Sequence, residues 1–196
     1  MNYSIAIHGG AGTILKSEMT SKQEADYQDA LNGALTAGYE VLDKGGSSLD
    51  AVELAVTYLE NCPLFNAGKG SVFTNQGTHE MDASIMNGLD QSAGAVAMLH
   101  AVKNPINLAR LVMEKTSHVL LAGQGAMDFA NQMKVEMKND DYFFNYQLKN
   151  TKAENFLSIK NNNVIQNDSA KKAMRFITDA FYETSKYLLL TNKKKQ

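Results

Sequence analysis

The sequence predicts a layered α/β or α+β domain, and three observations support this prediction. An apolar run at residues 5–7 breaks into a glycine-rich loop, which is typical of a buried strand that ends in a tight turn. Two amphipathic helices are expected next, and a strand hairpin at residues 81–99 follows them. Strands followed by helices, with a hairpin in the middle, are typical of elements that pack in layers.

The glycine-rich loop at residues 8–12 is the most informative segment of the chain. Glycine tolerates positive φ and lets another group approach the main chain closely, so a loop of this kind usually lies at a site. His8, at the end of the predicted strand, keeps two interpretations at this stage. It either shapes the loop by bonding to the backbone or takes part in the site.

Two helices are predicted from their start and stop signals. Ser21 with Glu24 three residues later matches a capping box, and Gly45 has the place of a C-terminal capping glycine. Apolar residues recur at helical spacing between these signals, namely Tyr27, Leu31, Ala34, Leu35, Gly38 and Leu42. Ser47 starts a second helix, with an apolar face of Val52, Ala55, Val56 and Leu59. Both helices are expected to pack on a sheet.

The segment of residues 61–77 is predicted to be a long irregular loop, which is usually a functional feature when it lies inside a domain. Residues 81–86 then predict a strand, Asn87-Gly88 a hairpin turn, and residues 93–99 a buried partner strand. Asn104-Pro105 opens another helix, with proline at its first position. A short strand at residues 119–122 and a helix at residues 124–133 complete the pattern.

The distribution of charge divides the chain into two parts. Residues 1–150 hold 10 basic and 17 acidic residues, whereas residues 151–196 hold 9 basic and 4 acidic ones. The first part is expected to form a domain of strands with covering helices. The second is expected to be a flexible linker rich in Asn and Lys, a weak helix at residues 173–190 and a basic tail.

Composition excludes several classes of protein. The net charge of −2 gives no reason to expect nucleic acid or a membrane surface as a partner. Cys62 is the single cysteine, so an internal disulfide is impossible and a reducing compartment fits. The sequence also has no apolar run of about 18 residues and no basic-then-apolar leader. We therefore expect a soluble, cytoplasmic protein.

No complete catalytic constellation is visible in the sequence. A lipase or esterase would need a G-x-S-x-G elbow and a phosphate-binding loop would need G-x-x-x-x-G-K-[ST], and both are missing. The histidines are scattered and form no zinc motif, so His79, His100 and His118 are interpreted as hydrogen-bonded structural residues. Such a gap would be explained if the nucleophile lay on a different polypeptide.

Three further sets of residues admit a chemical and a structural interpretation. Cys62 fits a small apolar filler better than a nucleophile, because no base is recognisable near it. Glu80 and Asp82 share a strand face and could form a carboxylate pair, although such acids are more often solvated or bonded to loop amides. The polar residues that open the second helix fit capping roles, and they are Ser47, Ser48 and Asp50.

Taken together, several segments resemble the α subunit of the plant-type L-asparaginases, or isoaspartyl peptidases, within the N-terminal-nucleophile hydrolases. The resemblance covers about 130 residues in order, and several of its blocks are highly specific. The matching segments are residues 8–12 (HGGAG), 45–52 (GGSSLDAV), 61–70 (NCPLFNAGKG), 78–86 (THEMDASIM), 93–96 (AGAV) and 121–127 (LAGQGAM).

The resemblance implies a four-layer αββα sandwich, of which this chain is the α-subunit part. It also implies a precursor that cuts itself to free a threonine at the start of a β subunit. That threonine attacks the amide of L-asparagine or of a β-aspartyl dipeptide, with its own α-amino group as the base. Two αβ pairs, (αβ)2, form the implied assembly. No catalytic nucleophile is expected in this chain, and the chain alone is not expected to be active.

The resemblance also carries over to particular residues. Asn66 matches the asparagine whose side chain lies beside the nucleophile, and Gly9 and Gly10 match a glycine loop near the same site. A sodium ion is implied on main-chain carbonyls, because carbonyl oxygens suit a hard cation. Its implied ligands are Leu59, Glu60, Cys62, Phe65, Ala67 and Lys69. Lys69 departs from the family, in which an apolar residue is common at that position.

A second interpretation belongs to a different class of protein. The chain could be a non-catalytic binding or regulatory domain that keeps the scaffold without its nucleophile. Neither Thr184 nor Thr191 is followed by the Val-Gly-Ala pattern that begins the family's β subunit. The coding sequence beyond Gln196 would therefore decide between the two interpretations.

Overall fold

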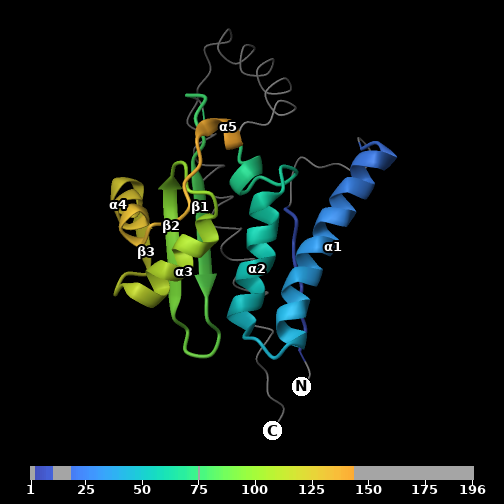
Figure 1. The fold of residues 1–196 in the computed structure, drawn as a ribbon, viewed down its shortest axis with the longest axis horizontal. Helices are drawn as coiled ribbons and strands as arrows, with labels where there is room; N and C mark the ends of the chain where they lie inside the picture. Colours follow the sequence, from blue (N-terminus) through green and yellow to red (C-terminus); the bar gives the residue numbers. More distant parts are fainter. Residues whose placement is uncertain (1–2, 11–18, 75, 144–196) are drawn as a thin grey trace, which may run out of the picture. The chain divides into compact units, whose positions relative to one another are not determined.

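The structure is a computed structural model that describes residues 3–10, 19–74 and 76–143. The predicted linker, weak helix and basic tail of residues 151–196 lie outside the described residues. The elements follow one another as shown in Figure 1. They are α1 (Ser21–Asp43), α2 (Ser48–Asn61), the 3-10 turn η2 (Gly68–Gly70), β1 (Met81–Met86), β2 (Ala93–Leu99), α3 (Pro105–Lys115), β3 (Leu120–Ala122), α4 (Gly123–Met133) and α5 (Asp140–Phe143).

The three strands form one small mixed sheet in the order β1-β2-β3. β1 pairs with β2 antiparallel, with Ile85 opposite Gly94, and β3 pairs with β2 parallel. One face of this sheet is buried by α3 and α4, whose apolar residues share a core with the strands (Figure 1). The fully buried members include Val96, Leu99, Leu108, Val112, Ala126 and Ala130. The predicted mixed class, the two long strands, β3, α3 and α4 are thus confirmed.

The hairpin connection between β1 and β2 differs from the prediction. Residues 87–92 link the strands, instead of a two-residue Asn-Gly turn. The Asn87 side chain accepts a hydrogen bond from the Leu89 N–H at 3.1 Å, and Asp90 accepts one from the Ser92 N–H at 3.0 Å. Gln91, and not Gly88, has positive φ in this segment, at 64°. These bonds from side chain to backbone stabilise a longer loop than the Asn-Gly pair alone predicts.

The first two helices pack on each other, and this corrects the expectation that both lie on a sheet. A Cβ added at Gly38 of α1 would come within 2.8 Å of the Ala51 carbonyl oxygen in α2, so the two backbones approach closely. α2 also reaches the core through Leu49, Val52 and Val56. Within the described residues, α2 therefore packs against this core and α1 packs on α2.

The ends of these helices agree with the predictions to within one residue. The N-cap of α1 is Thr20, and its capping box partner is Gln23. The expected pair, Ser21 and Glu24, was wrong by one position because both pairs fit the same pattern. Gly45 follows the C-cap with φ 82°, and Ser47 caps α2 by accepting from the Asp50 N–H, as predicted.

The N-terminal apolar run is extended, but it is not the buried strand that was predicted. Residues 3–10 make no strand pairing with the described part of the chain, and Ile5 and Ile7 are half-buried. The run lies along α1, where Ile5 reaches the Gly38 position and the Tyr3 hydroxyl donates to Asp43 at 2.8 Å. The alternation of apolar residues determines which side chains face the helices. A strand also needs a neighbouring strand with which its backbone can form hydrogen bonds.

The close contact between β2 and α3 gives a testable prediction. A Cβ added at Gly94 would lie 2.1 Å from the Ala109 carbonyl oxygen and 2.6 Å from the Met113 nitrogen, and both are backbone atoms. Gly94→Ala should lower the free energy of unfolding by about 3 kcal/mol, because the helix must move off the strand. Chemical denaturation measures this loss.

Gly125 in α4 supplies the control for that measurement. A Cβ added there meets nothing within 4 Å. Gly125→Ala should therefore raise stability by about 0.5 kcal/mol through the lower entropy of the unfolded chain. Equal effects of the two substitutions would contradict the close packing of α3 on β2.

Candidate functional site

The predicted irregular loop after α2 folds into a tight coil of main chain. The Ala67 N–H donates to the Phe65 carbonyl at 2.8 Å, and the Gly70 N–H donates to the Ala67 carbonyl at 3.0 Å. Gly68 has φ 50°, and a Cβ there would lie 2.3 Å from the Glu60 carbonyl oxygen. The coil therefore needs glycine at position 68, because a side chain there would displace the Glu60 carbonyl.

The structure brings the N-terminal glycine loop onto this coil. A Cβ on Gly9 would lie 3.0 Å from the Phe65 ring and 2.9 Å from the Leu31 side chain. Phe65 is buried and packs edge-on against Tyr27, with ring centroids 5.7 Å apart. Gly10 has φ 109° and open space at its Cβ position. Two segments about 55 residues apart in the sequence thus meet, as expected for parts of one site.

Asn66 is exposed beside this contact and is held by the next segment of the loop. Its side-chain oxygen accepts a hydrogen bond from the Val72 N–H at 2.9 Å. The neighbouring Ser71 hydroxyl is hydrogen-bonded to Nδ1 of His79 at 3.1 Å, and both of these side chains are buried. The loop therefore presents the Asn66 amide to solvent from a backbone that is fixed on two sides.

Two histidines receive specific roles in this region. His8 accepts a hydrogen bond from the Gly10 N–H through Nδ1 at 3.2 Å, which agrees with the loop-shaping interpretation. His79 lies between the rings of Phe73 and Phe143, with centroids 4.4 and 5.9 Å away. Burial lowers the pKa of His79, because the low dielectric disfavours the imidazolium. Its Nε2 has no hydrogen-bond partner among the described residues.

Of the carbonyls expected to hold sodium, those of Leu59 and Glu60 lie in the last turn of α2, and the other four lie in the coil that follows. Three of the six already accept one hydrogen bond each: Leu59 from the Cys62 N–H, Phe65 from the Ala67 N–H and Ala67 from the Gly70 N–H. A carbonyl oxygen has two lone pairs, so each of these keeps one for a cation. Among the described residues no group of three or more His, Cys, Asp or Glu side chains could hold a metal ion.

The charge of Lys69 is directed to α5. Its ammonium lies 5.4 Å from the centre of the Tyr142 ring, and the Lys138 ammonium lies 5.5 Å from the same centre. A ring face attracts a cation, so Tyr142 gives the Lys69 charge a partner outside the coil. This contact accounts for a lysine at a position where the resemblance leads us to expect an apolar residue.

The remaining candidate residues are structural in this geometry. Asp82 accepts from the Met98 N–H at 2.8 Å and stabilises a bulge in β2, where Met98 has φ 56°. Glu80 lies instead 3.9 Å from His100, so the two acids form no catalytic pair. Cys62 is half-buried and free, in agreement with a filler role.

Sequence reasoning missed the side chain of Glu60. It is only 3% exposed, and its carboxylate accepts from the Ile106 N–H at 2.9 Å and from the Asn104 amide at 3.1 Å. Asn104, the N-cap of α3, makes no capping bond of its own, so Glu60 caps that helix from α2. Burial raises the pKa of Glu60 to about 8. No local sequence signal marks this role, because the donors lie at the start of α3.

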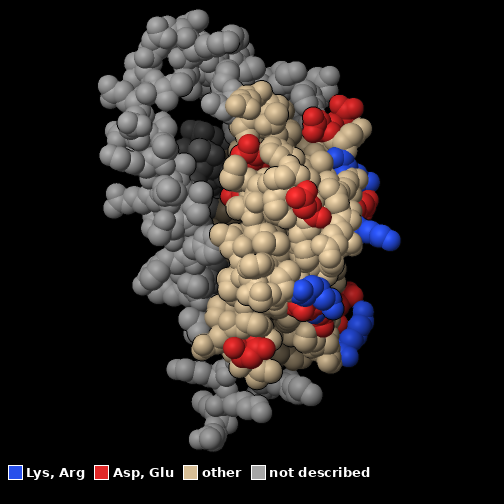
Figure 2. All heavy atoms as spheres, turned by 90° about the vertical axis from the view of Figure 1, so that its left-hand side faces the viewer, with Lys and Arg blue, Asp and Glu red and all other residues tan. Residues whose placement is uncertain are grey.

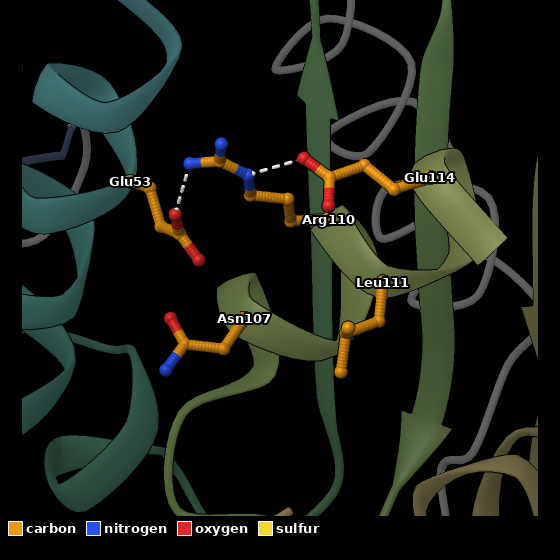
Figure 3. Close-up of a pocket in the computed structure, with 5 residues that line it drawn as sticks. All are labelled: Glu53, Asn107, Arg110, Leu111 and Glu114. Atoms are coloured by element: carbon orange, nitrogen blue, oxygen red, sulfur yellow. Dashed lines mark hydrogen bonds and ion pairs between the residues drawn. The ribbon is translucent and has the colours of Figure 1, made fainter. Parts of the chain in front are cut away.

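Arg110 forms a second link between α2 and α3 (Figure 3). It pairs with Glu53, with Asp50 at 2.6 Å and with Glu114 at 2.7 Å. The Ser47 hydroxyl and Arg110 lower the pKa of Asp50. A hollow of about 330 Å³ beside Arg110 is lined by none of the predicted site residues. We therefore place the candidate site at the glycine loop and the coil.

Comparisons with known proteins identify the family of this chain. The family model described as asparaginase matches residues 1–184. The isoaspartyl peptidase of Salmonella typhimurium is 48% identical over 139 residues, which cover 71% of this chain and 44% of that protein. The plant-type L-asparaginase of Pyrococcus furiosus is 55% identical over 130 residues, which cover 66% of this chain and 41% of that protein. The isoaspartyl peptidase/L-asparaginase of Mus musculus is 49% identical over 131 residues, which cover 67% of this chain and 39% of that protein.

These three relatives bear the names of amide and peptide hydrolases. The chain belongs to the asparaginase family, since the family match extends over most of its length. The resemblance to the plant-type L-asparaginases and isoaspartyl peptidases is confirmed. The chain spans about two fifths of the length of the curated relatives it matches. Within the described residues no helix is long and apolar enough to cross a membrane.

Removal of the Glu60 carboxylate should weaken the join between α2 and α3. Glu60→Ala leaves the buried Ile106 N–H without an acceptor and opens a cavity, so the free energy of unfolding should fall by about 2–4 kcal/mol. Glu60→Gln keeps an acceptor oxygen and nearly the same volume, and it should cost about 1 kcal/mol. Urea titrations of both variants measure these losses. Equal losses would show that packing, and not capping, is the role of Glu60.

The buried imidazole of His79 should make stability depend on pH. The folded state keeps the ring neutral, while the unfolded chain binds a proton below about pH 6.5. Stability should therefore fall as the pH drops from about 6.5 towards the lowered folded pKa. His79→Gln should flatten this part of the profile in thermal melts. His118→Gln, which removes an exposed imidazole, should leave the profile unchanged, and a similar effect of both variants would contradict the assignment.

Proposed function

We propose that this chain is the α-subunit part of an autoprocessed threonine amidohydrolase that acts on L-asparagine and β-aspartyl dipeptides. The observation that carries the proposal is the contact of Gly9 with Phe65, next to the exposed Asn66. The family membership and the printed names of the relatives supply the reaction class. In this proposal Asn66, Gly9 and Gly10 support the substrate site from one side.

The nucleophile of the proposed enzyme belongs to a second polypeptide, the β subunit cut from the same precursor. Its threonine hydroxyl attacks the carbonyl carbon of the substrate amide, and its α-amino group accepts the hydroxyl proton. The described residues hold one pair of a hydroxyl and an imidazole, Ser71 with His79, that could in principle act as nucleophile and base. Both side chains are more than nine-tenths buried, so this pair cannot reach a substrate. This burial supports a nucleophile on another polypeptide.

A four-layer αββα sandwich and an (αβ)2 assembly are the proposed architecture. On the sheet face that alternates with the core positions, several residues are small or polar and at least partly exposed, as a face that receives a second sheet would be. They are Asp82, Ser84, Ala93, Ala97 and Ala122. Ala95 on the same face is buried, and Met86 and Leu120 there are large and apolar. Figure 2 views the side of α4 and β3, where charged side chains gather in small groups on a largely uncharged surface. Val119 and Leu120 of this edge are 61% and 55% exposed.

A structural sodium ion is proposed in the coil that follows α2. The main-chain carbonyls of Leu59, Glu60, Cys62, Phe65, Ala67 and Lys69 would hold it, since hard oxygen ligands suit this cation. When bound, the ion would neutralise carbonyl dipoles that the coil brings close together. The tight approach of Gly68 to the Glu60 carbonyl supports such a ring of oxygens. A cytoplasmic location is proposed on the single cysteine.

The alternative is a non-catalytic binding or regulatory domain that keeps the same scaffold. Expression of the complete coding region discriminates between the two. The amidohydrolase should split itself, show threonine at the new N-terminus and release ammonia from asparagine. Purified residues 1–196 alone should release none. An uncut product without ammonia release would establish the binding domain instead.

The side chain of Asn66 tests the site in that complete enzyme. Asn66→Ala should lower kcat/KM for asparagine by roughly 10- to 100-fold, as the loss of one positioned polar group does. Asn131→Ala removes an exposed asparagine of α4 and should leave the rate unchanged. Thermal melts should show both variants folded. Full activity of Asn66→Ala would remove this residue from the proposed site.

A further inference from the structure

We propose that Asn87 and Gly88 form a spontaneous modification site, at which the chain converts its own asparagine into an isoaspartyl residue. The Gly88 nitrogen attacks the side-chain carbonyl carbon of Asn87 and loses its proton to solvent. The bond from that carbon to Nδ2 breaks, and Nδ2 leaves with a proton as ammonia. Water then opens the cyclic imide at either carbonyl, which gives an aspartyl or an isoaspartyl linkage to Gly88.

The side chain of Asn87 is directed towards the reacting peptide. Its oxygen accepts the Leu89 N–H at 3.1 Å, and this bond closes a turn over the Gly88 peptide. The carbonyl carbon is thereby held on the same side of the chain as the Gly88 nitrogen. The same donor polarises the carbonyl and would stabilise the negative charge that develops on its oxygen during attack.

The attacking group is accessible. Gly88 is exposed, and no Cβ shields its nitrogen. No described residue accepts a hydrogen bond from the Gly88 N–H, so the amide need not break one before it reacts. The backbone of Asn87 is anchored instead through its own N–H, which donates to Ser92 at 2.8 Å, and its carbonyl, which accepts from Gln91 at 2.8 Å. Both anchors leave the Gly88 nitrogen untouched.

The chain contains one other Asn-Gly pair, Asn32-Gly33, and it provides an internal comparison. Asn32 is exposed and Asn87 is half-buried, so access of the asparagine side chain to water does not favour Asn87 over Asn32. Gly33 lies inside α1, where the helical backbone engages its N–H and sets a geometry unsuited to ring closure. A Cβ on Gly33 would also lie 2.2 Å from the Tyr58 hydroxyl, which shows how closely α2 covers this peptide. The fold is therefore expected to make Asn87 more reactive than Asn32.

The conversion has a structural consequence for the hairpin. An isoaspartyl linkage adds one methylene to the main chain directly after β1. The extra length changes the connection that sets Met86 opposite Ala93, and a new carboxylate appears close to Asp90. The modified hairpin should therefore be less stable than the original one.

The test follows both pairs in the same sample. The full chain is aged in mildly alkaline buffer, digested and analysed by mass spectrometry with a fragmentation method that distinguishes isoaspartate. Conversion at Asn87 should be at least about tenfold faster than at Asn32, a barrier difference of about 1.4 kcal/mol. In denaturing urea the ratio should approach one, because the flanking residues are similar in the two pairs. Equal rates in the folded chain, or a ratio that persists in urea, would overturn the proposal.

A variant isolates the role of the attacking amide. Gly88→Ala places a methyl group beside the nitrogen and should slow conversion at Asn87 by about tenfold, with no change at Asn32. Circular dichroism checks that the variant is folded. An unchanged rate at Asn87 in the folded variant would show that water hydrolyses the amide directly, and the cyclic route would be wrong.

Discussion

The side chain of Glu60 links the end of α2, which leads into the site, to the start of α3, which packs in the core. Glu60 lies in the last turn of α2, and its side chain caps the start of α3. Burial of an acidic group is unfavourable unless its oxygens are bonded, and both oxygens of Glu60 have donors. Loss of this link would free the end of α2, from which the coil starts, from the start of α3, which is why we regard it as the constraint on which the geometry of the site depends.

The glycines of the site act together with this link. Gly68 and Gly70 let the coil close on its own carbonyls, and Gly9 lets the N-terminal run reach Phe65. Each of these contacts would be filled by a Cβ, so the site is shaped by main chain more than by side chains. In the proposed function, such a surface would position the substrate, and the reactive group would come from the β subunit.

The local elements could be predicted where sequence signals and tertiary packing agree. Proline at the start of α3, the alternation in β1 and the glycine after α1 each act over a few residues, and each was confirmed. The apolar run at residues 5–7 was predicted as a strand because alternation does not reveal whether a neighbouring strand exists.

The site was predictable only in part, and for a different reason. Spacing and chemistry alone left His8 with two roles and gave no purpose to Asn66, whose position came from the family resemblance. The capping role of Glu60 could not be predicted, because its donors lie more than 40 residues away in the sequence. Buried polar groups are specified by tertiary partners, and a single sequence does not contain that pairing in its local pattern.

The short helix α5 closes the described part of the chain against the coil. Phe143 is only 1% exposed and lies against His79, while the Tyr142 ring has the ammoniums of Lys69 and Lys138 near it. These contacts anchor the last described residues beside the coil (Figure 1). The conformation of the coil therefore depends on aromatic residues far later in the chain, and not on its glycines alone.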